Sequence, residues 1–259
     1  MIPKKHLGQH FLVDPNVKRR ILAACELNRK DVILEIGPGP GVLTKAMMEM
    51  VDSIYAVEVD SALCRQLQSE HPDARLKIIQ GDFLKYPLVT LPSGMKVIGN
   101  LPYNISTPII EKLIAHRSRF KQLFFTVQLE FGNRLAAQPD SRDYGALSCF
   151  VQYYADVRIL FRIKNAAFRP VPKVTSCFLR MIFREPVYKA PDEILLFEIT
   201  RRAFQQRRKK IGNALGRLFP SEQIDSALQA LNIDQNARAE NLTLRDFVEL
   251  SKVLGKKDG

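Results

Sequence analysis

The sequence predicts an α/β protein in which a doubly wound parallel sheet is followed by a small all-helical domain. A β-branched apolar run at 32–36 leads through a glycine-rich turn at 37–41 into a helical pattern from 42 to about 50. This order of strand, turn and helix opens doubly wound sheets, whose ligands bind at the carboxyl ends of the strands. After residue 186 the apolar residues follow only a helical period, so no strand is predicted there.

The length and composition fit this two-part organisation. A chain of 259 residues, of which 46% are hydrophobic, can fill one large core and one small one. The proline-bounded stretch 186–191 is predicted to be a linker. We therefore expect a first domain at 1–186 and a second domain at 187–259.

The charge balance indicates a polyanionic partner. The chain has 39 Lys and Arg residues against 27 Asp and Glu residues, a formal net charge of +12. Such an excess is typical of proteins that bind nucleic acid or an anionic membrane surface, and charge alone does not separate the two. The sequence has no apolar run of about eighteen residues and no secretory signal, so we expect a cytoplasmic protein without a membrane span.

The cysteines are widely spaced, lie among apolar neighbours and include no Cys-x-x-Cys pair. We expect buried, reduced thiols rather than disulfides or a zinc site. The four histidines are not at ligand spacing either, so no structural metal is predicted. The cysteines are Cys25, Cys64, Cys149 and Cys177.

The N-terminal segment 4–12 is basic at first and then mixes polar and apolar residues around Gly8. Such a segment can be a flexible tail. Its alternating apolar residues, which end at Leu12, instead predict that it packs on the main body. Gln9 and His10 would then face something polar.

The glycine turn narrows the class of ligand. A dinucleotide site needs the spacing Gly-x-Gly-x-x-Gly, whereas here Gly37, Gly39 and Gly41 alternate and Val42 follows. Glycines let the backbone turn tightly and approach a ligand closely. Glu35, two residues before the turn, suits a ligand with a cationic amino-acid portion, and S-adenosylmethionine is such a ligand.

The second predicted strand, 54–60, ends in acidic residues about twenty positions beyond the glycine turn. At that distance a carboxylate meets ribose hydroxyls in doubly wound folds. We assign this contact to Glu58. Asp60 is expected to cap the helix that begins at Ser61.

The third predicted strand, 76–80, brings Asp82 and Phe83 to the same edge of the sheet. Asp82 can accept a hydrogen bond from the amine of an adenine ring, and Phe83 can flank that ring. A helix or turn cap is an equally good explanation of Asp82 alone. The recurrence of an acid at three successive strand ends, with Glu35 and Glu58, favours a ligand site.

The stretch 100–103 follows the fourth strand and contains Asn100, Leu101, Pro102 and Tyr103. The Asn100 side chain and the Pro102 carbonyl offer two acceptors beside the flat ring of Tyr103. Two acceptors that hold the hydrogens of an adenine amine would free its lone pair for reaction. Asn and Pro are also common at strand-to-turn junctions, so the tetrapeptide by itself leaves both explanations open.

The loop 167–176 holds a second aromatic candidate. Two prolines fix it in an extended conformation, so Phe168 is predicted to be rigid. With Arg169 and Lys173 beside it, we expect an exposed Phe168 that stacks on a base from the face opposite Tyr103; the alternative is an ordinary packing residue. Further strands are predicted at 123–129, 156–163 and 175–183.

The second domain is strongly basic. Helices are predicted at 192–204, 208–218, 221–231 and 243–254. Seven cations between residues 201 and 217 are opposed over the same span by no acid. A run of charge is usually a solvated face, but this excess favours RNA or DNA binding. These cations are Arg201, Arg202, Arg207, Arg208, Lys209, Lys210 and Arg217.

With these residues together, the chain closely resembles the ribosomal RNA adenine dimethyltransferases, which modify two adjacent adenosines near the end of small-subunit rRNA. The resemblance runs nearly end to end, and the order and spacing of its motifs make it specific. The stretches that carry it are 8–12, 34–44, 58–60, 80–82, 100–106 and 168–176.

The resemblance implies a Rossmann-like, S-adenosylmethionine-dependent methyltransferase domain with a small C-terminal all-helical domain. It implies that 100–103 hold the target adenine. Bacterial members often have Asn where this chain has His10, and both side chains can hydrogen-bond the methionine end of the cofactor. The implied S-adenosylmethionine site is lined by His10, Leu12, Gly37, Glu58, Asp82 and Asn100.

The implied reaction moves the sulfonium methyl to the exocyclic amine of adenine, twice on each of two adenosines, giving N6,N6-dimethyladenosine. The leaving group is good, so the work of the protein is placement. We expect a monomer that acts on rRNA in a partly assembled small subunit. Three rivals stay open: a large-subunit rRNA methylase, a non-catalytic nucleic-acid-binding factor and a nicotinamide-dependent dehydrogenase.

Overall fold

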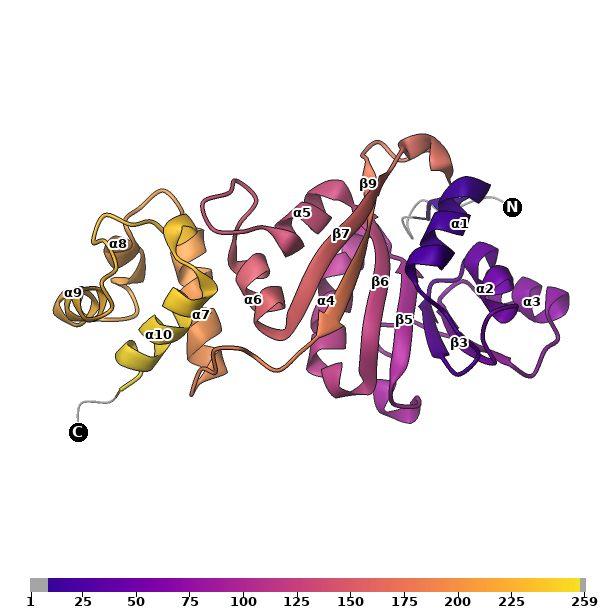
Figure 1. Ribbon diagram of the computed structural model, residues 1–259, viewed down its shortest axis with the longest axis horizontal. Helices are drawn as coiled ribbons and strands as arrows, with labels where there is room; N and C mark the ends of the chain where they lie inside the picture. The colour runs from indigo at the N-terminus through magenta and orange to yellow at the C-terminus, as the bar shows by residue number, and fades with distance from the viewer. Residues whose placement is uncertain (1–8, 257–259) are drawn as a thin grey trace. The chain divides into compact units, whose positions relative to one another are not determined.

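The structure, a computed structural model, describes residues 9–256, so the predicted packing of segment 4–12 is seen only from Gln9 onward (Figure 1). The chain forms two compact units. The first contains the residues up to 132 together with 156–183, and the second contains 133–155 and the residues from 184 onward.

This division differs from the predicted one at residues 133–155. The predicted first domain ran without interruption to residue 186, but the segment 133–155 belongs to the helical unit. Its helix α6 (Ala146–Tyr154) places Phe150 and Tyr153 against Phe197, with ring centroids 5.1 and 5.5 Å apart. This aromatic packing joins segments that are distant in the sequence, and periodicity alone does not reveal it.

The α/β prediction is confirmed for the first unit. Seven strands form a sheet in the order β4-β3-β2-β5-β6-β9-β7; those from β4 to β6 are parallel, and β9 is antiparallel to β6. The chain runs outward from β2 to β4 and then crosses to β5, which makes the β2–β5 boundary the switch point where such sheets bind ligands. The strands are β2 Val32–Ile36, β3 Ser53–Glu58, β4 Leu76–Gln80, β5 Met95–Asn100, β6 Phe120–Gln128, β7 Ala155–Ile163 and β9 Ser176–Phe183.

The register brings four carboxyl ends to one edge of the sheet. Ile36 of β2 lies opposite Gly99 of β5, and Glu58 of β3 lies opposite Gln80 of β4. Because side chains that follow these positions must gather at the same edge, the register fixes where a ligand site can form.

One face of the sheet packs on α1 (Pro15–Ala24) and α2 (Val42–Met48). Met47 is buried in one continuous apolar cluster with Phe124 of β6 and Phe178 of β9. This cluster removes the apolar face of both helices from water and anchors the turn that precedes α2. The other helices of this part of the chain are α3 Ser61–Glu70 and α4 Ser106–Ala115; α5 Leu129–Ala136 begins in the first unit and ends in the second.

A second, two-stranded sheet pairs β1 (Phe11–Leu12) with β8 (Phe168–Arg169). The strands are antiparallel, and Phe11 lies opposite Arg169. This small sheet fixes the N-terminal segment against the loop between β7 and β9.

The second unit is helical, as predicted. Its second helix is shorter than the predicted 208–218 and covers only Ile211–Leu215. The last helix begins with a capping box, in which Thr243 Oγ1 accepts from the Asp246 amide and Asp246 accepts from the Thr243 amide. The helices are α6, α7 Glu193–Gln205, α8 Ile211–Leu215, α9 Ser221–Ala230 and α10 Leu244–Leu254.

All four cysteines are buried free thiols, as predicted.

Between residues 9 and 256, no helix combines the length and the apolar character that a membrane span requires. No group of three or more His, Cys, Asp and Glu side chains in that range is arranged to hold a metal ion. Short 3-10 helices lie at Leu88–Thr90, Tyr103–Ile105, Arg117–Arg119, Asn165–Ala167 and Ala239–Asn241.

Candidate active site

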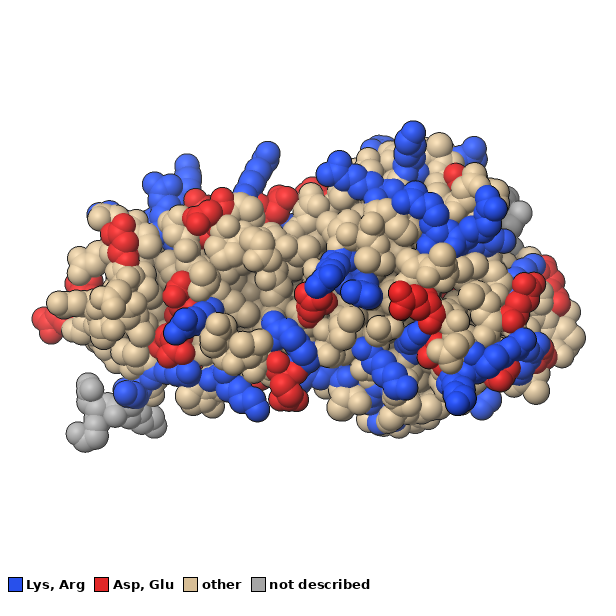
Figure 2. Space-filling view, viewed as in Figure 1, with Lys and Arg blue, Asp and Glu red and all other residues tan. Residues whose placement is uncertain are grey.

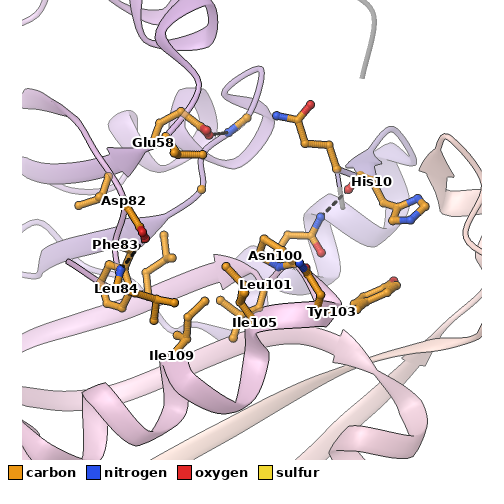
Figure 3. A pocket seen from close by; sticks show the side chains of 18 of the residues that line it. His10, Glu58, Asp82, Phe83, Leu84, Asn100, Leu101, Tyr103, Ile105 and Ile109 are labelled. Atoms are coloured by element: carbon orange, nitrogen blue, oxygen red, sulfur yellow. Dashed lines mark hydrogen bonds between the residues drawn. The ribbon is translucent and has the colours of Figure 1, made fainter. Parts of the chain in front are cut away.

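A pocket opens at the carboxyl ends of β2, β3, β4 and β5 (Figure 3). It gathers most of the predicted site residues from strands that are separated along the sequence. Leu12 and Phe168 are not among its lining residues. The predicted residues that line it are His10, Gly37, Gly39, Glu58, Asp82, Phe83, Asn100, Leu101, Pro102 and Tyr103.

The glycine turn forms one wall of the pocket. Gly37 and Gly39 have φ angles of +66° and +58°, in the left-handed region that side chains other than Gly rarely adopt. A Cβ atom at Gly39 would also lie 3.1 Å from the Phe11 ring. The turn can therefore approach a ligand closely only with glycine at these two positions.

Glu58 joins the turn to the second strand. Its side chain is 5% exposed; Oε2 accepts from the Gly39 amide at 3.1 Å, and Oε1 accepts from the Asp60 amide at 2.9 Å. Burial raises the pKa of Glu58, and these backbone hydrogen bonds oppose that rise. A carboxylate has about four lone-pair sites, so Glu58 retains acceptor capacity for a ligand hydroxyl.

Asp82 lies at the next strand end. Its Oδ1 accepts from the Leu84 amide at 2.9 Å, whereas Oδ2 makes no hydrogen bond to any residue between 9 and 256 and stays available. The predicted cap role and the predicted ligand role thus use different oxygens. Phe83, Ile105 and Ile109 add apolar walls beside it (Figure 3), so a flat ring with an amine at its edge fits this end of the pocket.

Lys112 of α4 supports that end of the pocket, and our sequence analysis did not identify it. Its Nζ donates to the carbonyls of Phe83, Leu84 and Tyr86 at 2.9, 2.8 and 2.6 Å, and it lies 5.5 Å from the Phe83 ring centroid. Burial lowers the pKa of Lys112, and the charge of Asp82 opposes this. The residue stands alone in a helical pattern, so only the folded contacts reveal its role.

Asn100 occupies the centre of the site, between the two ends of the pocket. Its Nδ2 donates to the main-chain carbonyl of His10 at 2.6 Å (Figure 3). Because this contact fixes the orientation of the amide, Oδ1 is left as a hydrogen-bond acceptor.

The prediction that the Pro102 carbonyl is a free acceptor is wrong. That carbonyl already accepts from the Ile105 amide at 3.2 Å and from Ser106 Oγ at 3.0 Å. Both donors belong to the turn that leads into α4, so the carbonyl stabilises the start of this helix. Leu101, which directly follows Asn100, supplies another main-chain carbonyl of the motif.

Tyr103 is held from two sides. Its hydroxyl shares a hydrogen bond of 2.7 Å with Ser176 Oγ, and its ring stacks on His10 at a centroid distance of 5.6 Å and an angle of 21°. His10 in turn donates from Nδ1 to the Pro170 carbonyl at 2.8 Å. The ring is therefore fixed at the pocket, but one of its neighbours is the His10 ring.

The prediction of an exposed Phe168 is wrong. The ring is 1% exposed and belongs to the same apolar cluster as α1 and α2, together with Leu12. The pairing of β1 with β8 turns both side chains inward, away from the pocket. Neither side chain lines the pocket in this conformation, and both hold the loop and the N-terminal segment in place.

Glu35 is also outside the pocket. It is buried, and its carboxylate accepts from Thr44 Oγ1 at 2.6 Å. Burial raises its pKa to about 7, while the Thr44 hydrogen bond opposes that rise. The expected contact with a cationic portion of the ligand is therefore wrong, because the side chain points toward α2.

The comparisons with known proteins agree with this geometry. The sequence model described as "Ribosomal RNA adenine dimethylase" matches residues 3–256. The chain belongs to the ribosomal RNA adenine dimethylase family. Two similar curated proteins are named "Ribosomal RNA small subunit methyltransferase A". The one from Aromatoleum aromaticum is 39% identical over 98% of this chain and 95% of its own length. The one from Moorella thermoacetica is 38% identical over 98% of this chain and 93% of its own length.

Solved structures support the same assignment. A dimethyladenosine transferase from Plasmodium falciparum superposes with a TM-score of 0.83 and 25% identity over 93% of this chain and 96% of that one. The 23S rRNA methyltransferase ErmE superposes with a TM-score of 0.74 over 95% of this chain and 100% of that one, and at 23% identity it shows the shared fold alone.

As a member of this family, the protein is an S-adenosylmethionine-dependent rRNA adenine dimethyltransferase, and the pocket fits that cofactor. The cofactor carries a ribose diol and an adenine amine, which are hydrogen-bond donors. Glu58 and Asp82 each keep unused acceptor positions, and the apolar walls beside Asp82 match a flat purine. The donor and acceptor chemistry of both partners is therefore complementary.

The predicted RNA-binding residues lie in the second unit. Arg201, Arg208, Lys209 and Lys210 are exposed, and Arg202 is half-buried. Arg207 differs from them, because its guanidinium pairs with Glu240 at 2.6 Å and donates to the carbonyls of residues 141 and 142. The prediction that it is a free cation is wrong, since an acid distant in the sequence neutralises it.

Proposed function

We propose that the protein dimethylates two adjacent adenosines near the 3′ end of small-subunit rRNA. The observation that carries this proposal is the junction at Asn100, where a pocket for a nucleoside cofactor meets a polar acceptor beside an aromatic ring. The names of the curated relatives, which match this chain over nearly its full length, favour the small subunit as the source of the substrate.

The cofactor would lie across the strand ends. Glu58 would accept hydrogen bonds from the ribose hydroxyls, and Asp82 Oδ2 would accept from the adenine amine. The Gly37 and Gly39 turn would lie against the cofactor, and Phe83 would flank the purine. Bound S-adenosylmethionine supplies an electrophilic methyl group on a positively charged sulfur.

The target adenine would be held by acceptors at its exocyclic amine. We assign them to Asn100 Oδ1, which the His10 carbonyl orients, and to the Leu101 carbonyl, since the Pro102 carbonyl is engaged within its own turn. Two acceptors would draw the amine hydrogens into one direction and leave the nitrogen lone pair aimed at the methyl group. As the N–C bond forms the C–S bond breaks, and the amine proton leaves to water.

A single aromatic face, that of Tyr103, would support the base. Such stacking is worth about 1–3 kcal/mol per base in single-stranded complexes. The adenine must leave its stack in the RNA to reach this pocket, which is the usual requirement for enzymes that modify a base. Tyr103 would offset part of the cost of unstacking.

The second unit would bind rRNA through its exposed cations, which would release counterions from the phosphates. We assign this role to Arg201, Arg202, Arg208, Lys209 and Lys210 and leave out Arg207 because it is paired with Glu240. We further propose that the protein acts as a monomer in the cytoplasm, on rRNA within a partly assembled small subunit.

The test is a methylation assay on small and large ribosomal subunits that lack these modifications. The purified protein is incubated with each subunit and isotopically labelled S-adenosylmethionine, and the rRNA is digested and analysed by mass spectrometry. We expect N6,N6-dimethyladenosine at two adjacent positions near the 3′ end of small-subunit rRNA. Label confined to large-subunit rRNA, or no label in either, would contradict the proposal.

A further inference from the structure

The loop between β7 and β9, residues 164–175, lies beside the acceptor half of the pocket, which is the half that contains Asn100 and Tyr103. The Pro170 carbonyl in its middle accepts from His10, which stacks on Tyr103. The residue that follows the loop, Ser176, hydrogen-bonds the Tyr103 hydroxyl. The loop is therefore tied to Tyr103 near both its middle and its end.

The loop is held in one conformation by contacts along its length. Phe168 is sunk in the apolar core, and the Ala167 carbonyl accepts from the Val13 amide at 2.8 Å. Asn165 Nδ2 donates across the loop to the Pro172 carbonyl at 3.0 Å. Side chains on its outer surface are thus presented from a fixed backbone, which lowers the entropy lost when they bind a ligand.

That outer surface carries uncompensated cations. Lys164, Arg169 and Lys173 are exposed, and none of them forms an ion pair with a residue in the described range 9–256. The stretch 164–176 contains no Asp or Glu. The carboxylate of Asp14, which lies near Ala167, is occupied by the first amides of α1.

Two aliphatic side chains alternate with the cations. Val171 is 53% exposed and Val174 is 42% exposed, on either side of Lys173. Arg169 donates from Nη1 to the carbonyls of its own loop at 3.3 and 2.9 Å, and its Nη2 is left for another acceptor. Figure 2 shows Lys and Arg side chains gathered over the part of the first unit where Figure 1 places β7, β9 and α1.

We propose that this loop binds the phosphates of the single-stranded RNA that flanks the target adenine. An adenine drawn into the pocket carries its own backbone to the pocket mouth, and Arg169 and Lys173 lie along the loop that frames this mouth. Arg169 offers planar donors that match a phosphate, and Lys173 offers a point charge. Val171 and Val174 would contact the sugar or base of a neighbouring nucleotide.

This inference rests on the proposed function and adds a second RNA contact to it, on the loop of the first unit. The sequence placed the RNA contact of this loop on the ring of Phe168, whereas the structure buries the ring and exposes the cations beside it. The basic charge of the first unit then has a role in positioning the substrate, separate from the cations of the helical unit.

The test compares the salt dependence of RNA binding in two double variants. R169Q/K173Q removes two charges from the loop, and R65Q/K30Q removes the same charges from exposed positions on α3 and before β2. Binding of a fluorescently labelled RNA hairpin with two adjacent adenosines in its loop is measured by anisotropy from 50 to 300 mM salt. Affinity for S-adenosylhomocysteine is measured on the same samples.

We expect the slope of log K against log salt to become shallower by about 1.4 in R169Q/K173Q, since each single-strand phosphate contact contributes about 0.7. Affinity at physiological salt should fall about tenfold by the same relation. S-adenosylhomocysteine affinity should be unchanged, and R65Q/K30Q should bind RNA like the wild type. K173Q alone, at a position with no hydrogen bond in the described structure, should reduce the slope by about half as much.

Equal slopes in the loop variant and the wild type would overturn the inference, as would an equal loss of slope in R65Q/K30Q. A loss of S-adenosylhomocysteine affinity with an unchanged slope would also overturn it, because the loop would then only shape the pocket. Failure of the proposed function has a different signature, namely a wild-type protein that binds the hairpin but methylates neither ribosomal subunit.

Discussion

The two halves of the pocket are assembled differently. The cofactor half is the part of the pocket that contains Glu58 and Asp82. Their carboxylates accept hydrogen bonds from amides at most nineteen residues away in the sequence, and two of these hydrogen bonds span only two residues. In the acceptor half, the hydrogen bond of Asn100 to His10 spans 90 residues of the sequence, and that of Tyr103 to Ser176 spans 73. Local backbone contacts thus shape the first half, and contacts between distant segments shape the second.

This difference indicates how each half responds to change. A side chain in the cofactor half keeps its position as long as its strand end and the neighbouring turn or loop are intact. A side chain in the acceptor half depends on the N-terminal segment and on the loop after β7, so variants there should alter substrate positioning with little effect on cofactor affinity. Three experiments test whether the two halves respond separately.

The largest effect is expected for Asn100→Ala. The variant removes the acceptor that we propose for the reacting amine, and loss of one such positioned group typically costs about 10²–10³-fold in kcat. Single-turnover methylation of small subunits measures this loss, and calorimetric titration with S-adenosylhomocysteine should give an affinity within about threefold of the wild type. A loss of cofactor affinity as large as the loss of rate would show that the two halves are not separable.

An intermediate effect is expected on the pH dependence of stability. The pKa of Glu35 is about 7 in the folded protein against 4.5 when unperturbed, so the folded state holds a proton that the unfolded state releases between these values. The free energy of unfolding therefore falls as pH rises from about 4.5 to 7, by on the order of 3 kcal/mol from this group. Urea unfolding at a series of pH values measures the decline.

Glu35→Gln should flatten that decline, because the amide does not titrate. A part of it should remain, since burial also raises the pKa of Glu58. Glu49→Gln, an exposed substitution of the same kind, is the matched control and should leave the curve parallel to that of the wild type. Parallel curves for Glu35→Gln as well would show that the buried carboxylate is not the source.

The smallest effect is expected for Lys112→Met, which keeps the alkyl chain near Phe83 but removes three hydrogen bonds to the loop beside Asp82. We expect the Kd for S-adenosylhomocysteine to rise about tenfold, as for the loss of one strong charged hydrogen bond, with kcat at saturating cofactor nearly unchanged. Titration calorimetry measures the first and initial rates measure the second.

Lys85→Met is the control for Lys112→Met, because it removes a charge from the same loop at an exposed position. Its Kd should stay close to that of the wild type. If both variants weakened binding equally, the contribution of Lys112 would be its charge rather than its hydrogen bonds.

Much of the fold and of the cofactor half was predictable. The switch from a β-branched run to alternating glycines locates the turn at 37–41, and Glu58 and Asp82 follow from the ends of the next two strands. The site predictions that are wrong share one feature: each concerns the surroundings of a side chain or carbonyl. Phe168 lies in a basic, proline-rich loop that looks exposed, but β1 covers it, and Arg207 meets an acid that is 33 residues away.

The strands of the main sheet, the positions of their carboxyl ends and the family of the chain were predictable from the sequence, because they depend on local periodicity and on motif spacing. The two short strands β1 and β8 were not predicted. Only the tertiary structure decided which polar groups stay free for a ligand. Asn100 Oδ1 is available because Nδ2 is engaged by His10, and the Pro102 carbonyl is unavailable because Ser106 donates to it. A buried polar group takes whichever partner the packed chain brings within reach, and that partner is set by contacts between segments far apart in the sequence.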